Sequence, residues 1–375
     1  MPTSRFSLTA LAAVLLAAAP SAQIPTSGAP LGVASPPAAG EIAASRRTAI
    51  TEAVEAASPA VVSVNVIEVR QVRVRDPFAD FFGGVPSRVY EQQVQGLGSG
   101  FIVSSDGYIV TNDHVAGNAT RITVAFPDGT TLDARLVGSD PETDIALLKV
   151  EPPGPLPFLA FDPEHDPAVG EWAIALGNPF GLFEAAEPTV TVGVVSAIGR
   201  DFPAQQGRTF RDLIQTDAAI NSGNSGGPLV NAAGRVMGMN TFIYSQSGGS
   251  VGLGFAVPAW RIQRVVEELR ATGRVDRAFY TGLNVRPLTD RMVRQLGLAD
   301  AAGLIVASVD ENSPAARAGL RPYDVIVSIA GAPVRTNEDV RQRLVDNRPG
   351  DTVELGLVRD GEATPARHTL GTTTG

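Results

Sequence analysis

The chain has 375 residues, of which 44% are hydrophobic and 18% charged, so it is long enough for two folded domains with their own cores. Its formal net charge is −9, and no basic stretch with interleaved aromatic residues occurs, which argues against a nucleic-acid partner. The chain has no cysteine, which excludes both disulfides and a thiol nucleophile.

Lys149 is the only lysine of the chain. It follows leucine inside an apolar run, so the Gly-Lys-Ser/Thr of a phosphate-binding loop is absent. ATP dependence through such a loop is therefore excluded, and a Ser–Lys catalytic dyad is disfavoured. We expect neither a cofactor nor a metal site.

The N-terminus has the pattern of a secretory signal over residues 1–22. Arg5 precedes a mostly apolar run over residues 6–19, and small residues follow it up to Ala22. The run is shorter than the roughly twenty residues that span a bilayer. Pro20 makes the cleavage site imperfect, which leaves an uncleaved N-terminal anchor as the alternative. Residues 23–46, rich in Pro, Ala, Gly and Ser, predict a flexible linker.

Short apolar strands separated by turns fill residues 47–258. A short helix that includes Ile50, Val54 and Ala57 comes first and breaks at Pro59. Asp-Gly pairs at residues 106–107 and 128–129 are hairpin signals. Regular short strands without long helices predict β-barrels. Residues 70–95 carry three phenylalanines without clear periodicity, which favours a lid or a subunit contact, with a buried structural loop as the alternative.

Ser225 lies in the glycine-rich stretch from Asn221 to Pro228, the setting that a nucleophilic serine needs. Glycines let the backbone turn tightly, so that successive N–H groups point at one spot. The N–H groups around the serine are the candidates for an oxyanion hole, namely those of Gly223, Asn224 and Ser225. Without a base elsewhere, the stretch would be an ordinary glycine-rich turn.

Only three histidines could serve as that base. His165 lies in an acidic loop broken by prolines, and His368 lies close to the C-terminus, where we expect fraying. His114 follows the apolar run 108–110, and strand ends are common positions for catalytic side chains. His114 is therefore the predicted base.

A carboxylate must orient the histidine. Asp113 is adjacent to His114 and is expected to point away from it. Asp144 heads the apolar run 145–150, where it can hold a histidine N–H in a low-dielectric setting. The resulting chain order, His114, Asp144 and Ser225, is the chymotrypsin-type order.

At these residues the sequence resembles the HtrA (Deg) serine proteases. Their three active-site signatures match residues 111–115, 143–150 and 223–228, and the resemblance covers nearly all of the chain after about residue 47. It implies an all-β, double-barrel trypsin-like (chymotrypsin-fold) domain over residues 47–258, with the triad named above. It also implies a periplasmic protein, soluble once its signal is cleaved, that assembles through its protease domains into a homotrimer or a multiple of trimers, with a loop near residues 70–95 capping the active site.

Two further loops follow from the same resemblance. Residues 177–181 look like the family's loop before the middle strands of the second barrel, but the stretch from Leu182 to Pro188 is a few residues longer than usual. The pocket for the residue before the cleaved bond is expected from residues just before Ser225 and from residues 248–255. Ala219 and Ile220 offer no charge there, which predicts cleavage after small or medium aliphatic residues.

A linker helix is predicted over residues 259–279. Pro258 opens it, one face carries aliphatic residues, and it stops near Gly273. The aliphatic residues of that face are Ile262, Val265, Val266 and Leu269. A partner-binding helix is the alternative.

Residues 280–372 predict a mixed α/β domain that resembles a PDZ domain, most clearly at residues 319–326. Residues 303–309, 324–329 and 352–358 are strand-like, and Ser313 and Thr336 each cap a helix. Tyr323 stands where the family usually has glycine, and Ala330 where it often has asparagine. A PDZ domain holds a peptide's C-terminal carboxylate by backbone N–H groups. The matching peptide-binding positions are Tyr280, Thr281, Gly282, Leu283, Val340 and Leu344.

The sequence thus predicts an exported, ATP-independent serine endopeptidase that degrades unfolded or damaged proteins and binds C-terminal peptides through one PDZ domain. One alternative is a regulatory, site-specific protease of envelope stress signalling. The other is a non-catalytic chaperone or PDZ scaffold.

Overall fold

The computed structural model describes residues 45–74, 88–162, 167–178, 187–205, 207–221, 223–243, 250–296 and 302–372. The first long helix, α2 (Ala49–Ala57), begins at a capping box in which Thr48 and Thr51 bond each other's backbone. It leads through the 3₁₀ turn η1 (Ser58–Ala60) into the first strand. Ile50 and Val54 pack against the main core and Ala57 is fully buried, as the apolar spacing predicts.

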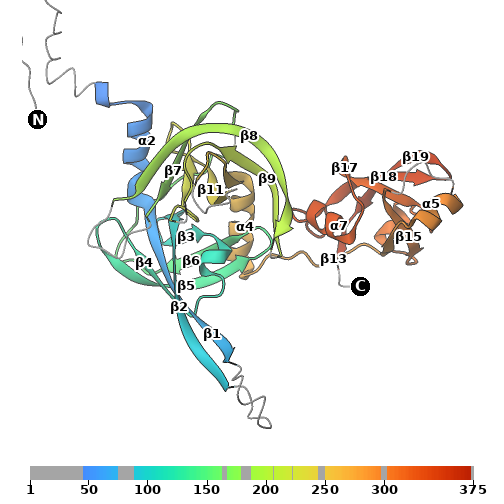
Figure 1. Cartoon of the computed structure of the whole chain (residues 1–375), viewed down its shortest axis with the longest axis horizontal. Coiled ribbons are helices and arrows are strands. Elements are labelled where there is room, and N and C mark those ends of the chain that lie inside the picture. The colour runs from blue at the N-terminus through green and yellow to red at the C-terminus, as the bar shows by residue number, and fades with distance from the viewer. Residues whose placement is uncertain are drawn as a thin grey trace, which may run out of the picture. The chain divides into compact units, whose positions relative to one another are not determined.

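Two closed six-stranded barrels form the larger part of the described chain (Figure 1), which confirms the predicted double-barrel fold. The first has the strand order β1-β2-β3-β6-β5-β4 and the second the order β10-β11-β12-β9-β8-β7. The strands of the first are β1 (Val61–Val74), β2 (Arg88–Ile102), β3 (Tyr108–Thr111), β4 (Arg121–Ala125), β5 (Thr131–Asp140) and β6 (Ile145–Val150). Those of the second are β7 (Trp172–Gly177), β8 (Thr189–Gln205), β9 (Arg208–Thr216), β10 (Pro228–Val230), β11 (Val236–Ile243) and β12 (Gly254–Pro258).

The lone lysine of the chain, Lys149, lies in the core of the first barrel. Every residue of β6 is buried, including Lys149, which is 9% exposed. Its ammonium group donates to the carbonyl of Val150 at 2.8 Å, lies 3.2 Å from the carboxylate of Glu151, and sits 5.6 Å from the ring centre of Tyr108. The charge is thus compensated by these neighbouring groups.

Helix α4 (Ala259–Thr272) follows the second barrel. Pro258 is its N-cap, and Gly273 ends it in a left-handed conformation, φ 74°. The predicted aliphatic face is confirmed, because all four of its residues are buried: Ile262, Val265, Val266 and Leu269.

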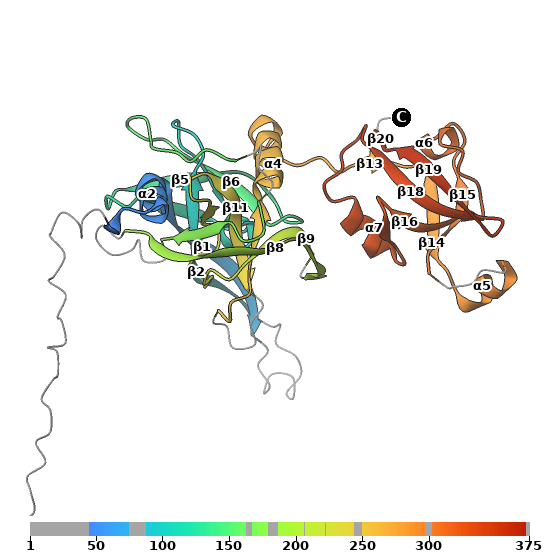
Figure 2. The same ribbon diagram turned by 90° about the horizontal axis from the view of Figure 1, so that it is seen from above.

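The C-terminal part of the chain forms a separate sheet, of which β14-β15-β16-β18-β19 is the continuous path (Figure 2). Its strands are β14 (Leu283–Pro287), β15 (Leu304–Val309), β16 (Val325–Ile329), β17 (Ala332–Pro333), β18 (Thr352–Arg359) and β19 (Glu362–Thr369). The short strands β13 (Phe279–Tyr280) and β20 (Gly371–Thr372) pair with each other. The helices are α5 (Asp290–Leu296), α6 (Pro314–Arg317) and α7 (Asn337–Arg343), and α7 packs beside the edge strand β14.

The turns around β16 keep unusual backbone angles. Tyr323 has φ 76° and Ala330 has φ 49°, so both lie in the left-handed region although neither is glycine. At Tyr323, where the family usually has glycine, the backbone thus keeps a conformation that glycine adopts freely. A residue with a side chain adopts it only at a cost in conformational free energy.

The expectation that His368 lies in a frayed terminus is wrong. It belongs to β19, pairs in register with Val353, and is 2% exposed. Burial lowers the pKa of its imidazole below the ordinary value. The chain continues through β20 back to the start of the C-terminal sheet, which holds this end in place.

Candidate active site

His114 and Asp144 meet between two elements of the first barrel. His114 lies in the one-turn helix α3 (Asp113–Ala116), directly after β3. Its Nδ1 is 2.8 Å from Oδ2 and 3.0 Å from Oδ1 of Asp144, and its backbone N–H donates to Oδ1 at 3.0 Å. The side-chain amide of Asn112 donates to the carbonyl of Asp144 at 3.0 Å, which ties the helix to the loop before β6. The imidazole is 37% exposed and so remains open to a substrate.

The Asp144 carboxylate is held as an anion by several donors. Besides His114, the hydroxyl of Thr241 donates to Oδ2 at 2.8 Å and Nε of Arg208 donates to Oδ1 at 3.1 Å. Burial alone would raise the pKa of this carboxyl group. The side-chain and backbone hydrogen bonds from His114, with the bond from Thr241, outweigh that effect and hold the pKa below its ordinary value. Asp144 itself has a left-handed backbone, φ 61°, a strained conformation of the kind found at functional sites.

The turn that carries Ser225 packs against the strands leading to His114. The N–H of Ser99 in β2 donates to the carbonyl of Ser225 at 2.8 Å, and the hydroxyl of Thr111 in β3 donates to the carbonyl of Ser99 at 2.7 Å. Gly226 has φ 84°, and a Cβ there would lie 2.2 Å from the oxygen of Ser99. Glycine is therefore required for the nucleophile turn to approach the first barrel this closely.

The hydroxyl of Ser225 donates to the carbonyl of Thr241 at 3.3 Å, a long bond. Within the described residues that is its one hydrogen bond. Catalytic hydrogen bonds are often long or unmade before substrate binds. The structure thus joins His114 to Asp144 directly and joins Ser225 to the same cluster through Thr241.

The three N–H groups predicted for the oxyanion hole differ in their bonding. That of Asn224 donates to the carbonyl of Asn221 at 2.9 Å and is occupied. Among the described contacts, none engages the N–H of Gly223 or of Ser225. The carbonyl of Gly223 accepts the hydroxyl of Ser99 at 2.6 Å, which fixes the peptide that follows it.

Two residues that bond the Asp144 carboxylate, Thr241 and Arg208, lie in no recognisable motif and were not predicted from the sequence. Thr241 is 2% exposed and lies in β11. Arg208 begins β9, and its Nη2 donates to Oδ2 of Asp113 at 3.1 Å while its Nε reaches Asp144. The polar pair Asn240-Thr241 inside a mostly apolar strand was the one signal available for Thr241, and the sequence held none for Arg208.

Some predicted positions lie outside the described residues. These are the signal segment and most of the linker, His165, most of the loop from residue 177 to 188, residues 75–87 of the aromatic segment, and residues 248 and 249 of the expected substrate pocket. Of the remaining pocket positions, Ile220 is 1% exposed and packs so closely on Gly254 that a Cβ there would lie 2.6 Å from its side chain.

The predicted peptide-binding residues lie on β13, on the turn after it, on the edge strand β14 and on α7, which packs beside β14. Gly282 has φ 73° and follows β13, while Leu283 begins the edge strand β14. Val340 lies on α7 and packs, half-buried, against the core of this sheet. Leu344 is the C-cap of α7 and is 6% exposed, so it belongs to that core and presents little surface.

Residues 98–239 match the family of the trypsin-like peptidase domain, and residues 280–368 match the PDZ domain family. A solved structure, "HtrA-type protease AlgW with decapeptide", is 37% identical, with 87% of this chain and 99% of that chain covered and a TM-score of 0.62. This chain belongs to the HtrA-type serine proteases. The serine endoprotease from Yersinia pestis is 33% identical over 87% of this chain and 98% of its own, with a TM-score of 0.55.

A curated relative of this HtrA-type chain is the "Probable periplasmic serine endoprotease DegP-like" of Brucella suis biovar 1 (strain 1330). It is 44% identical over 267 residues, which cover 71% of this chain and 50% of the relative. The chain thus spans about half the length of such curated relatives. In the described ranges, no helix is long and apolar enough to cross a membrane.

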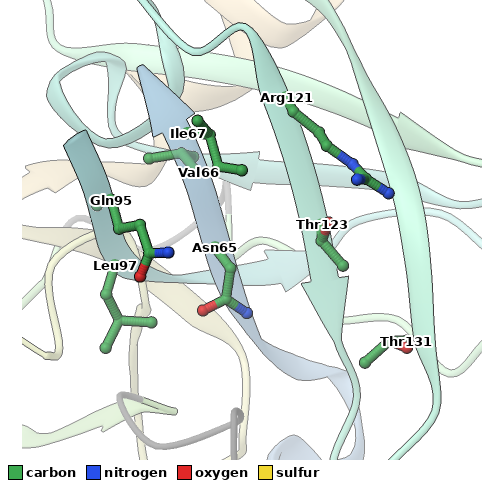
Figure 3. A pocket seen from close by; sticks show the side chains of 9 residues that line it. Asn65, Val66, Ile67, Gln95, Leu97, Arg121, Thr123 and Thr131 are labelled. Atoms are coloured by element: carbon green, nitrogen blue, oxygen red, sulfur yellow. The ribbon is translucent and has the colours of Figure 1, made fainter. Parts of the chain in front are cut away.

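The HtrA-type chain has a hollow on the outer face of the first barrel (Figure 3), with a volume of about 370 Å³. Rows of outward side chains from β2, β1 and β4 line it, because Leu97 pairs with Asn65 and Asn65 with Thr123. Arg121 lies at its rim and pairs with Asp133 at 3.1 Å. None of the triad residues lines this hollow.

Proposed function

We propose that this HtrA-type chain is an exported, ATP-independent serine endopeptidase that cleaves unfolded or damaged polypeptides in the periplasm. The observation that carries the proposal is the His114–Asp144 pair with the Ser225 turn packed against the same strands. A neutral imidazole whose Nδ1–H is held by a buried carboxylate presents Nε2 as a base. The partly exposed ring and the glycine-rich turn supply the other two requirements, access and oxyanion donors.

In the proposed reaction the hydroxyl of Ser225 attacks the peptide carbonyl while His114 takes its proton. The N–H groups of Gly223 and Ser225 stabilise the negative oxygen, since that of Asn224 is occupied. His114 then gives the proton to the leaving amine, and water hydrolyses the acyl-enzyme by the same steps. Ile220, buried against Gly254, supports an apolar pocket and cleavage after small or medium aliphatic residues.

The remaining parts of the proposal follow from the family. The C-terminal domain binds C-terminal peptides between the edge strand β14 and α7, with the turn over residues 280–283 receiving the carboxylate. The protease domains associate as a homotrimer or a multiple of it. Residues 1–22 direct export, and residues 47–258, 259–279 and 280–372 are the protease domain, the linker helix and the PDZ domain.

Digestion of casein by the full chain tests the proposed activity. The wild type and the control Ser105→Ala, an exposed serine, should digest casein, and Ser225→Ala should not. Retained cleavage by Ser225→Ala would disprove the mechanism. If the wild type and Ser225→Ala both suppress aggregation and neither cleaves casein, a non-catalytic chaperone would be favoured. Digestion that appears only after a C-terminal peptide is added would favour a regulatory protease over a degradative one.

A further inference from the structure

Arg208 connects two carboxylates beside the catalytic histidine. Its Nε donates to Asp144 and its Nη2 to Asp113, each at 3.1 Å, and its side chain is 17% exposed. Both carboxylates are nearly buried, with side-chain exposures of 2% for Asp144 and 7% for Asp113. A single planar guanidinium thus spans both acids, a geometry that a lysine cannot reproduce.

The surroundings hold each partner of this bridge. Gly117 leaves room for the Asp113 carboxylate, because a Cβ at that glycine would lie 2.1 Å from Oδ1. The start of β9 is fixed beside the Asp144 loop by a bond from the N–H of Thr209 to the carbonyl of Glu142 at 2.6 Å. The backbone beside Arg208 is therefore fixed, and its guanidinium group is held by one carboxylate at Nε and by another at Nη2.

The charge balance gives the bridge a consequence for the base. Two carboxylates and one guanidinium leave one net negative charge next to the imidazole of His114, which suits a base that must gain a proton and release it again. Without Arg208, the charge of Asp113, the residue before His114, would no longer be compensated and would favour the protonated form of the ring together with Asp144. Without Asp113, the charges of Asp144 and Arg208 would cancel, and the protonated form of the His114 ring would be less favoured.

We propose that Arg208 is a positioning residue of the active site that fixes the Asp144 carboxylate against His114 and compensates the charge of Asp113. This inference rests on the proposed function. The titratable and charged groups in direct contact with the bridge are Asp113 and His114 of α3, Asp144 of the loop before β6, and Arg208 of β9 itself. Thr241, on β11, contributes only a hydroxyl group.

The test is the rate at which a fluorophosphonate labels the enzyme, measured from about pH 5 to pH 9. This probe reports the reactivity of the nucleophilic serine without a natural substrate, and the acid limb of the profile reports the base. Four variants are compared with the wild type: Arg208→Gln, Arg208→Lys, Asp113→Asn, and the double variant that combines Arg208→Gln with Asp113→Asn. Arg235→Gln, which removes an exposed arginine between β10 and β11, is the matched control.

The variants should move the acid limb in opposite directions. Arg208→Gln should shift it about one pH unit upward and Asp113→Asn a similar amount downward, as expected for one unit charge at close range. The double variant should return it close to the wild-type position. Arg208→Lys should keep the acid limb but label more slowly than the wild type, because an ammonium group cannot bridge both acids. Arg235→Gln should match the wild type.

A merely structural role would lower the rate without moving the acid limb, and that result would overturn the proposal. An unchanged rate and profile in Arg208→Gln would overturn it as well. Thermal unfolding of each variant separates these results from misfolding, and Asp113→Asn provides the opposite shift even if Arg208→Gln is unstable. Labelling of the wild type but not of Ser225→Ala confirms the proposed function independently, and no labelling of the wild type would overturn both.

Discussion

Thr241 donates its hydroxyl group to Asp144 at 2.8 Å, and its own carbonyl accepts the hydroxyl of Ser225 at 3.3 Å. One residue of β11 therefore contacts both the carboxylate and the nucleophile of the triad. Because β11 lies in the second barrel and Asp144 in the first, this contact joins the two halves of the active site.

Thr241→Val tests that contact. Valine has nearly the same shape but no donor, so the buried carboxylate of Asp144 loses one hydrogen bond. We expect kcat to fall about tenfold and the free energy of unfolding to fall by about 1–2 kcal/mol. Casein digestion and thermal unfolding measure the two effects. Thr123→Val, at a half-buried site facing the exposed Asp133, is the control and should change neither; equal behaviour of the two variants would contradict the role of Thr241.

Gly226→Ala tests whether the nucleophile turn needs its close approach to the first barrel. The alanine Cβ would meet the oxygen of Ser99 at 2.2 Å in addition to the strain of φ 84°. We expect loss of activity and a destabilisation above about 2 kcal/mol. Gly170→Ala is the matched control, because Gly170 has φ 92° but nothing within 4 Å, so it should cost only about 1 kcal/mol. Equal destabilisation by the two substitutions would show that the contact is unimportant.

The short strands and hairpins could be predicted because strand patterns and turn residues are local signals, whereas the double barrel and the PDZ-type sheet were expected from the resemblance to the family. The pairing of His114 with Asp144 could be predicted because few histidines exist and each motif has a distinct context. Arg208 and Thr241 could not, since they reach Asp144 across 64 and 97 residues and neither lies in a recognisable motif. His368 was misjudged because nearness to the C-terminus was taken as fraying, whereas β20 holds that end against β13.

Tyr323→Gly should stabilise the C-terminal sheet. Tyr323 is 74% exposed, so its ring contributes little packing, while its backbone lies at φ 76°. Glycine removes the left-handed strain at some cost in unfolded-state entropy, and the net gain should be about 0.5–1 kcal/mol. Hydrogen exchange of β15 and β16 in the inactive Ser225→Ala background measures the change. Tyr323→Ala keeps the strain and should show no such gain; slower exchange in this control than in the glycine variant would contradict the explanation.

The buried imidazole of His368 should make the C-terminal sheet sensitive to mild acid. Burial lowers the pKa of this group in the folded state, so below about pH 6.5 the unfolded chain binds a proton that the folded chain does not. The contribution of His368 to stability is therefore fully present above that pH and is lost as the pH drops.

His368→Leu separates this effect from the other titrating groups. Among the described residues, neither buried ring nitrogen of His368 has a hydrogen-bond partner, so leucine should be tolerated at pH 7.5 and should stabilise the sheet by about 1 kcal/mol. Protection of the β18 and β19 amides, measured by hydrogen exchange at pH 7.5 and pH 5 in the Ser225→Ala chain, should fall with pH much less in the leucine variant. The carboxyl groups whose pKa values are lowered titrate at still more acidic pH and are common to both proteins. An equal loss of protection with and without the His368→Leu substitution would contradict this explanation, because another group would then cause the acid sensitivity.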